Sequence, residues 1–286
     1  MTWPLTRIFQ TKTQNDRRQS PRRVRRPQLE SLEGRIVQSV LFGAYSNGVY
    51  AYNSSNGSQT QVTPRTPNVM TEGSSGTLFM GMSDGVYEYS YATKSLNKIS
   101  PFTTSVMSAA RDNTLFATLN GRGTWEYNGS WHLINIFGAN ELAAVSNGRV
   151  YGGYNDGLWA YNQNTWTPVT PHKPVAMSAT SDSTLFVSFN DLGGITYRFN
   201  GSWQEITGHT ALAIDAVSDS SFFCTFANGG TFQYQEGSGL HTISSEVSPH
   251  IGNDGATFIG DFSSGTSIYQ NGRLHKIRSD QASQFA

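Results

Sequence analysis

The chain has 286 residues, of which 14% are charged, 12% are aromatic and 29 are glycine. This composition is typical of many short strands joined by tight turns, and it excludes a coiled coil or another long-helix protein. The single cysteine, Cys224, excludes a disulfide framework and a cysteine-rich zinc site. No stretch approaches the roughly 18 apolar residues of a membrane-spanning helix, so we expect none.

The net charge of zero hides a split between the two ends of the chain. Residues 1–35 hold nine Lys or Arg against three Asp or Glu, whereas residues 36–286 hold eleven against seventeen. The basic region is interrupted by prolines and has few apolar residues, so we expect residues 1–38 to form a disordered arm. Residues 39–286 are predicted to fold as one domain without the basic patch that nucleic-acid binding needs. A contact between the arm and RNA, DNA or anionic lipid is the alternative to a solvated tail or a targeting segment.

The arm ends in the segment LESLEGRIVQS, which spans residues 29–39. It resembles the LEPR-x-LL type segment at the start of exported planctomycete proteins, and Gly34 stands where that segment usually has an Asp. The resemblance implies export, with an extracellular or cell-surface location. The alternative is an amphipathic helical turn that ends at Gly34. An ordinary secretory signal is not expected, because the arm has no long apolar stretch. The matching residues are Leu29, Glu30, Leu32, Glu33, Arg35 and Ser39.

From residue 40 onward the chain repeats itself every 35 or 37 residues. Each repeat has an aromatic residue, then a small residue two positions later, a turn glycine, and a stretch that alternates apolar with polar residues. Alternation is the signature of a strand, and the small residue predicts close packing between neighbouring sheets. Asn-Gly pairs such as Asn128-Gly129 then predict tight hairpins, because both residues tolerate positive φ. The aromatic markers are Phe42, Phe79, Phe116, Tyr151, Phe186, Phe223 and Phe258.

A third strand with a large residue and a β-branched residue three positions on, as in Trp131 and Ile134, is followed by a fourth short segment. Each unit therefore predicts a four-stranded antiparallel sheet. Seven such units predict an all-β, seven-bladed β-propeller, because a ring buries both faces of every small sheet. The order of segments over residues 40–286 resembles a broad bacterial class of seven-bladed propellers that includes sensors, lectins, scaffolds and enzymes. The Trp-x-x-Ile pattern also resembles tectonin-type lectins, whose blades are longer.

The chain enters and leaves this repeat out of phase. It begins on the strand at residues 40–44 without a preceding innermost strand, and it ends on residues 282–286, one repeat after the innermost segment near Ser248. We therefore expect the last five residues to supply the innermost strand of the first blade, which closes the ring and removes a free sheet edge.

No catalytic signature is present in the sequence. There is no Gly-x-Ser-x-Gly elbow, zinc-binding helix motif or phosphate loop. The six histidines fall in different repeats, which favours exposed strand residues over metal ligands, and Cys224 is predicted to be a core residue. The recurring tryptophans suit sugar stacking, but their equivalent places favour packing between strands.

Polar loops between the second and third strands share one face of the ring with the connections into the innermost strands. We expect this axial loop face to bind ligands, because propellers commonly bind at their central opening. The same Asx residues also stabilise turns. Asp215 and His250 are added because they depart from the uncharged residues at equivalent places. The candidate ligand-binding residues are Asp84, Arg122, Asp156, Asp191, Asp215 and His250.

The sequence thus predicts an exported, non-catalytic binding or scaffold propeller that recognises surface glycans or proteins. The alternatives are a lyase or hydrolase with an axial active site and a purely structural array. We expect a monomer with no cofactor and no bound metal.

Overall fold

The structure, a computed structural model, describes residues 40–286 apart from residues 75, 228, 249–250, 254–257 and 271. The predicted arm and its sorting motif therefore lie outside the described residues, and the boundary at residue 38 stays a prediction. The described residues contain strands and no helices. None of them therefore forms a helix that could cross a membrane.

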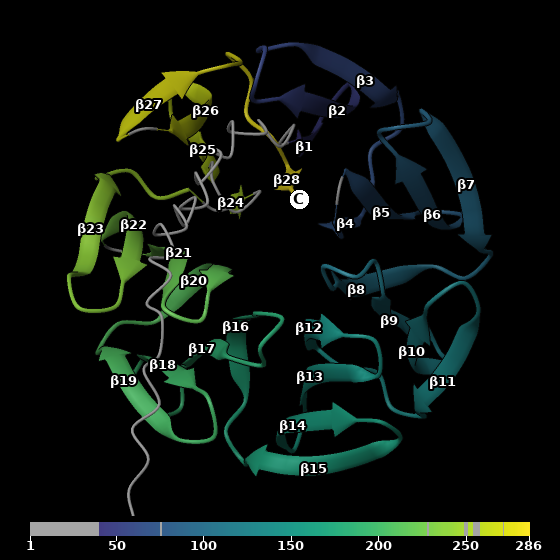
Figure 1. Cartoon of the computed structure of the whole chain (residues 1–286), viewed down its shortest axis with the longest axis vertical. Coiled ribbons are helices and arrows are strands. Elements are labelled where there is room, and N and C mark those ends of the chain that lie inside the picture. Colours follow the sequence, from purple (N-terminus) through teal and green to yellow (C-terminus); the bar gives the residue numbers. More distant parts are fainter. Residues whose placement is uncertain (1–39, 75, 228, 249–250, 254–257, 271) are drawn as a thin grey trace, which may run out of the picture. The chain divides into compact units, whose positions relative to one another are not determined.

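The described strands form seven sheets of four, arranged around a central opening (Figure 1). We number these sheets as blades in chain order and give each from its innermost to its outermost strand. Blades one to four are β28 (Gln284–Phe285), β1 (Val40–Tyr45), β2 (Gly48–Asn53) and β3 (Gln59–Thr63); β4 (Val69–Glu72), β5 (Thr77–Met82), β6 (Gly85–Ser90) and β7 (Ser95–Ser100); β8 (Thr104–Ala109), β9 (Leu115–Leu119), β10 (Gly123–Tyr127) and β11 (Trp131–Asn135); and β12 (Glu141–Ser146), β13 (Arg149–Tyr154), β14 (Gly157–Asn162) and β15 (Thr165–Thr170). Blades five to seven are β16 (Pro174–Ala179), β17 (Leu185–Phe189), β18 (Ile195–Phe199) and β19 (Trp203–Thr207); β20 (Ala211–Ser218), β21 (Ser221–Phe226), β22 (Gly230–Gln235) and β23 (Gly239–Ser244); and β24 (Ile251–Asn253), β25 (Phe258–Phe262), β26 (Gly265–Gln270) and β27 (Arg273–Lys276).

Every strand pairs antiparallel with its neighbours, so the chain is the seven-bladed β-propeller that its repeat predicts. The second strands are buried along their length, as in β1 and β21, whereas the outermost strands are largely exposed. The first six marker aromatics, Phe42 to Phe223, pack between blades: Phe116 of blade three packs with Ala144 and Val150 of blade four. Each blade therefore buries its apolar faces against the neighbouring blades, which only a closed ring provides for every blade.

The small residue after each marker aromatic allows this close approach. A Cβ atom on Gly81 would lie 2.7 Å from the Cγ2 atom of Thr104 on the next blade, and one on Gly153 would lie 2.4 Å from the Cγ atom of Pro174. Where the residue is larger, it bonds across the same junction: the Ser188 hydroxyl accepts a hydrogen bond of 2.8 Å from the Ala211 amide. The predicted packing role of this position is confirmed.

The outer-strand tryptophans also join neighbouring blades. The indole nitrogens of Trp131 and Trp166 each donate a hydrogen bond of 2.8 Å to the outer strand of the preceding blade, at the carbonyls of Ile99 and Ile134. The ring of Trp203 lies 4.7 Å from that of Phe199 in its own blade. These contacts agree with the packing role predicted for the series.

The carboxyl-terminal strand closes the ring, as expected. β28 pairs with β1 (Figure 1), and the amides of Phe42 and Ala286 donate to each other's carbonyl oxygens at 2.9 and 3.0 Å. Ala282 and Phe285 are buried there. The first blade is thus built from both ends of the propeller sequence.

Candidate functional site

The ring has two faces that differ in the chain segments they carry. One face, called the loop face here, carries the connections into the innermost strands and the loops between the second and third strands. The opposite face carries the turns that leave the innermost strands. Some of the predicted ligand-binding residues lie on the loop face, and one lies toward the opposite face.

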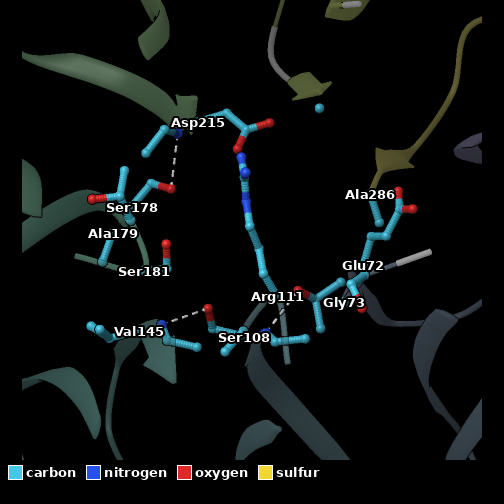
Figure 2. Close-up of a pocket in the computed structure, with 18 of the residues that line it drawn as sticks. Glu72, Gly73, Ser108, Arg111, Val145, Ser178, Ala179, Ser181, Asp215 and Ala286 are labelled. Carbon is cyan, nitrogen blue, oxygen red and sulfur yellow. Dashed lines mark hydrogen bonds between the residues drawn. The ribbon is translucent and has the colours of Figure 1, made fainter. Parts of the chain in front are cut away.

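A cavity of about 410 Å³ lies on the axis, toward the face opposite the loop face (Figure 2). Its wall is formed by the last residues of the innermost strands and the turns after them, and small side chains such as Ala144, Ser108 and Ser178 predominate. Small residues keep the centre open, because larger ones on seven strands would fill it.

Hydroxyl groups along this wall join the innermost strands of neighbouring blades. The side chains of Thr71, Ser108 and Ser178 accept hydrogen bonds from the backbone amides of Ala109, Ala144 and Ala216, at 3.1, 2.9 and 3.0 Å. Each acceptor lies one blade before its donor, at the same place in the repeat. An innermost strand has an unpaired edge, so these hydroxyls satisfy amides that would otherwise lack a partner in the protein.

Arg111 crosses this cavity. It follows β8 in blade three, and its Nη2 atom donates a hydrogen bond of 3.0 Å to the Val217 carbonyl of blade six. Figure 2 shows its guanidinium group directed toward Asp215, with Glu72 at the cavity edge. Asp215 is thus the one predicted site residue that lines the axial cavity among those the structure describes. His250 lies outside the described residues.

The other four predicted residues lie on the loop face, away from this cavity, and each has a structural contact. The Asp84 carboxylate accepts a hydrogen bond from Arg65, which precedes this blade, and another of 2.8 Å from the Tyr87 hydroxyl. These two bonds lower the pKa of Asp84 to about 2, that from Arg65 having the larger effect. In the equivalent place, Asp191 lies 3.0 Å from the Nδ1 atom of His172, again from the preceding blade.

Asp156 and Arg122 differ from this pattern. The Asp156 carboxylate accepts a hydrogen bond of 3.2 Å from the indole nitrogen of Trp159 in its own blade. The Arg122 guanidinium carbon lies 3.6 Å from the ring centroid of Phe102 on the preceding connection. The four residues occupy separate junctions around the loop face, so the structure does not gather them into one cluster.

The loop face also carries exposed apolar side chains that the sequence interpretation missed. Ile136, Phe137 and Leu212 are 73%, 68% and 51% exposed, and Phe102 and Val175 lie on the same face. Val175 and Leu212 stand where the register between first and second strands shifts by one residue. A β-bulge leaves the extra residue unpaired and re-aims its side chain, so simple alternation misplaces it. The sequence signal would have been an apolar pair directly after the outer strand, as in Ile136-Phe137.

One carboxyl near the axis has a strongly altered acidity. Burial raises the pKa of Glu141, at the start of β12, to about 7. Burial also raises the pKa of the Cys224 thiol, which suits the predicted core role rather than that of a nucleophile. His132, His241 and His275 are exposed on outer strands. In the described part of the chain no group of three His, Cys, Asp or Glu residues could hold a metal ion.

Comparison with known proteins identifies the fold and nothing finer. No family model and no curated protein matches this chain. Among solved structures, the WD40 repeats of RRP9 match 85% of this chain and 89% of their own, with a TM-score of 0.61 and 12% identity. An extracellular domain from B. thetaiotaomicron matches with a TM-score of 0.58 and 14% identity over 84% of this chain, which spans only 43% of that domain. YCF48 bound to D1 peptide matches 72% of this chain and 79% of its own, with a TM-score of 0.52 and 9% identity. The chain shares the β-propeller fold with all three.

Proposed function

We propose that this protein is an exported, non-catalytic binding or scaffold propeller whose loop face docks a protein partner. The observation that carries the proposal is the group of exposed apolar side chains on that face: Phe102, Ile136, Phe137, Val175 and Leu212. They come from the connections into four consecutive blades or the first residues of their innermost strands. These side chains share one face of four neighbouring blades, and exposed apolar surface of this kind is a common mark of a protein interaction site.

The polar groups of the loop face support binding rather than catalysis. Asp84 and Asp191 are hydrogen-bonded to Arg65 and His172, and the Asp156 carboxylate accepts a hydrogen bond from Trp159. A catalytic carboxylate needs access to its substrate and a convergent partner. The similarity to WD40 repeats and to a protein bound to a peptide supports a binding or scaffold role at the level of the fold.

A second function, a lyase or hydrolase, is favoured by one observation. Glu141 has a pKa raised to about 7, which is suited to a general acid at neutral pH. Asp215 lines the axial cavity toward the other face. An activity that is lost in Glu141→Gln with an unaltered fold would establish the enzyme in place of the scaffold.

The binding proposal is tested by placing a charge on the loop face. Leu212→Asp is expected to abolish capture of the partner from the source cells' surface fraction, because burying an unpaired carboxylate opposes docking. Leu274→Asp is the matched control, since Leu274 is exposed on the outer strand β27. Equal loss in both variants, or in neither, would contradict the proposal.

A glycan ligand is the other outcome of this experiment. A glycan panel probed with the wild-type chain, Asp156→Ala and Asp191→Ala would detect it, and binding that both substitutions weaken would replace the protein partner with a sugar. Light scattering of the purified chain tests the proposed monomer in the same preparation.

Export is proposed from residues 29–39, which lie outside the described residues. Residues 1–38 fused to a reporter are expected to direct it out of a planctomycete host. Leu32→Ala combined with Arg35→Ala is the control. Retention of the unaltered fusion in the cytoplasm would refute this part of the proposal.

A further inference from the structure

Five of the seven junctions between blades share one backbone arrangement on the loop face. The residue two positions after the last residue of the outer strand is held by a turn, in which its amide donates a hydrogen bond to the side chain two residues earlier. Examples are Arg65 to Thr63 at 3.2 Å and Phe137 to Asn135 at 3.0 Å. At these five junctions the backbone thus places one side chain in the same position. These residues are Arg65, Phe102, Phe137, His172 and Glu246.

At most of these junctions the delivered side chain contacts the loop or an aromatic ring of the next blade. Arg65 pairs with Asp84 and lies 5.2 Å from the ring centroid of Tyr87. His172 is hydrogen-bonded to Asp191, as described above, and the centroid of its ring lies 6.0 Å from that of Phe189. Glu246 accepts a hydrogen bond of 2.6 Å from the Ser263 amide. The recurring arrangement at two junctions is a basic group between a loop carboxylate and an aromatic ring.

The junction between blades three and four has a loop carboxylate, Asp156, but no basic group in this place. Phe137 stands in that place and is 68% exposed, so it does not cover the next blade. Phe137 lines a cleft of about 790 Å³. The cleft is lined by aromatic rings and by amide and carboxylate groups: Asn135, Phe137, Tyr154, Asn155, Asp156, Trp159 and Trp166.

We propose that this cleft binds an arginine side chain of a partner protein, an inference that rests on the loop-face function proposed above. The guanidinium group pairs with Asp156 and stacks on the Trp159 indole, as Arg65 does with Asp84 and Tyr87. Phe137 contacts the aliphatic part of the side chain. The excess of six negative charges over residues 36–286 favours such a partner. The contacts of Arg65 with Asp84 and Tyr87 are therefore the model for the contacts of the bound arginine with Asp156 and Trp159.

The probe is the blocked tripeptide Gly-Arg-Gly, titrated into the full chain while the indole N–H signals are followed by NMR. The signals of Trp159 and Trp166, assigned with Trp159→Phe and Trp166→Phe, are expected to shift. Asp156→Asn is expected to weaken binding by roughly tenfold, since it removes the charge and keeps the acceptor for Trp159. Asp84→Asn is the matched control and is expected to leave the affinity unchanged, because Arg65 already occupies its carboxylate.

A second variant restores the missing group. Phe137→Arg is expected to place a guanidinium on Asp156 from within the chain and so to abolish binding of the tripeptide without lowering the melting temperature. Binding that survives in Phe137→Arg would overturn the proposal. Equal binding of Gly-Gln-Gly, or shifts of these indoles by neutral sugars alone, would also overturn it.

Failure of this inference is distinguishable from failure of the loop-face function. A partner lost in Leu212→Asp but retained in Asp156→Asn refutes the arginine site and leaves the function standing. A partner retained in Leu212→Asp refutes the function, whatever the tripeptide does.

Discussion

Glu141 shows how the ring alters the chemistry of a single residue. Its carboxyl lies at the start of β12, where burial opposes the charged form and raises its pKa from 4.5 to about 7. Between these two values the folded protein keeps a proton that the unfolded chain releases. Stability from this group therefore falls as the pH rises from about 4.5 to 7.

Glu141→Gln removes this titration. The variant is expected to be more stable than the wild type above pH 7, by up to about 3 kcal/mol, and equally stable near pH 4. Urea unfolding at pH 4, 6 and 8 measures the difference. Glu205→Gln, on the exposed face of an outer strand, is the control. A gap between Glu141→Gln and wild type that does not change with pH would mean that the residue is not buried in this way.

At the scale of elements, the turn between second and third strands fixes the shape of each blade. Gly157 has a φ of +133°, and a Cβ atom there would lie 2.3 Å from the Thr170 carbonyl oxygen of the outer strand. The equivalent glycines Gly48, Gly85, Gly123 and Gly230 meet an outer-strand carbonyl in the same way, and Gly265 meets the carbonyl of Arg278, just after β27. A glycine is required here both for its conformation and for its lack of a side chain.

Gly157→Ala is expected to lower the free energy of unfolding by about 3 kcal/mol or more, because strain in φ and a clash with backbone act together. Gly129→Ala is the comparison: its φ is +98°, but no atom lies within 4 Å of the added Cβ. It should cost only about 1–2 kcal/mol. Denaturant midpoints give both values, and similar losses in the two variants would show that the close approach to Thr170 is relieved.

The elements were predictable because each is encoded by a pattern within its own repeat. The alternation of apolar and polar residues, the marker aromatic and the turn glycine predicted the four strands of each blade. The phase of the repeat predicted ring closure by the carboxyl-terminal strand. The Asn-Gly turns were predicted less well: Gly129 has positive φ but Asn128 does not.

The site was harder to predict because its contacts join different repeats. Arg65 and Asp84 are 19 residues apart, and only the angle between blades brings them together. Val175 and Leu212 are exposed through bulges that periodicity does not reveal. The raised pKa of Glu141 depends on surroundings that no local pattern contains.

At the scale of the whole molecule, ring closure depends on very few residues. Deleting Ala282–Ala286 removes β28, its backbone bonds to Phe42 and the buried ring of Phe285. Loss of a buried phenylalanine alone costs about 3–5 kcal/mol, a large part of a typical 5–15 kcal/mol of stability. The deletion should lower the melting temperature markedly, and Phe285→Ala should account for part of this. A truncated chain that melts with the wild type would mean that the first blade is closed by other contacts.

The hydroxyls of Thr71, Ser108 and Ser178 also restrict how this ring can take up a peptide. Many sheet proteins bind an extended peptide as an added strand, whose backbone pairs with the free amides of an edge. Around this axis the amides of Ala109, Ala144 and Ala216 are already bonded to the preceding blade. A peptide in the cavity cannot pair with those amides unless it breaks three bonds that hold blades together. At these three strands a peptide in the cavity is therefore expected to be recognised through its side chains, which makes recognition there depend on sequence rather than on backbone shape.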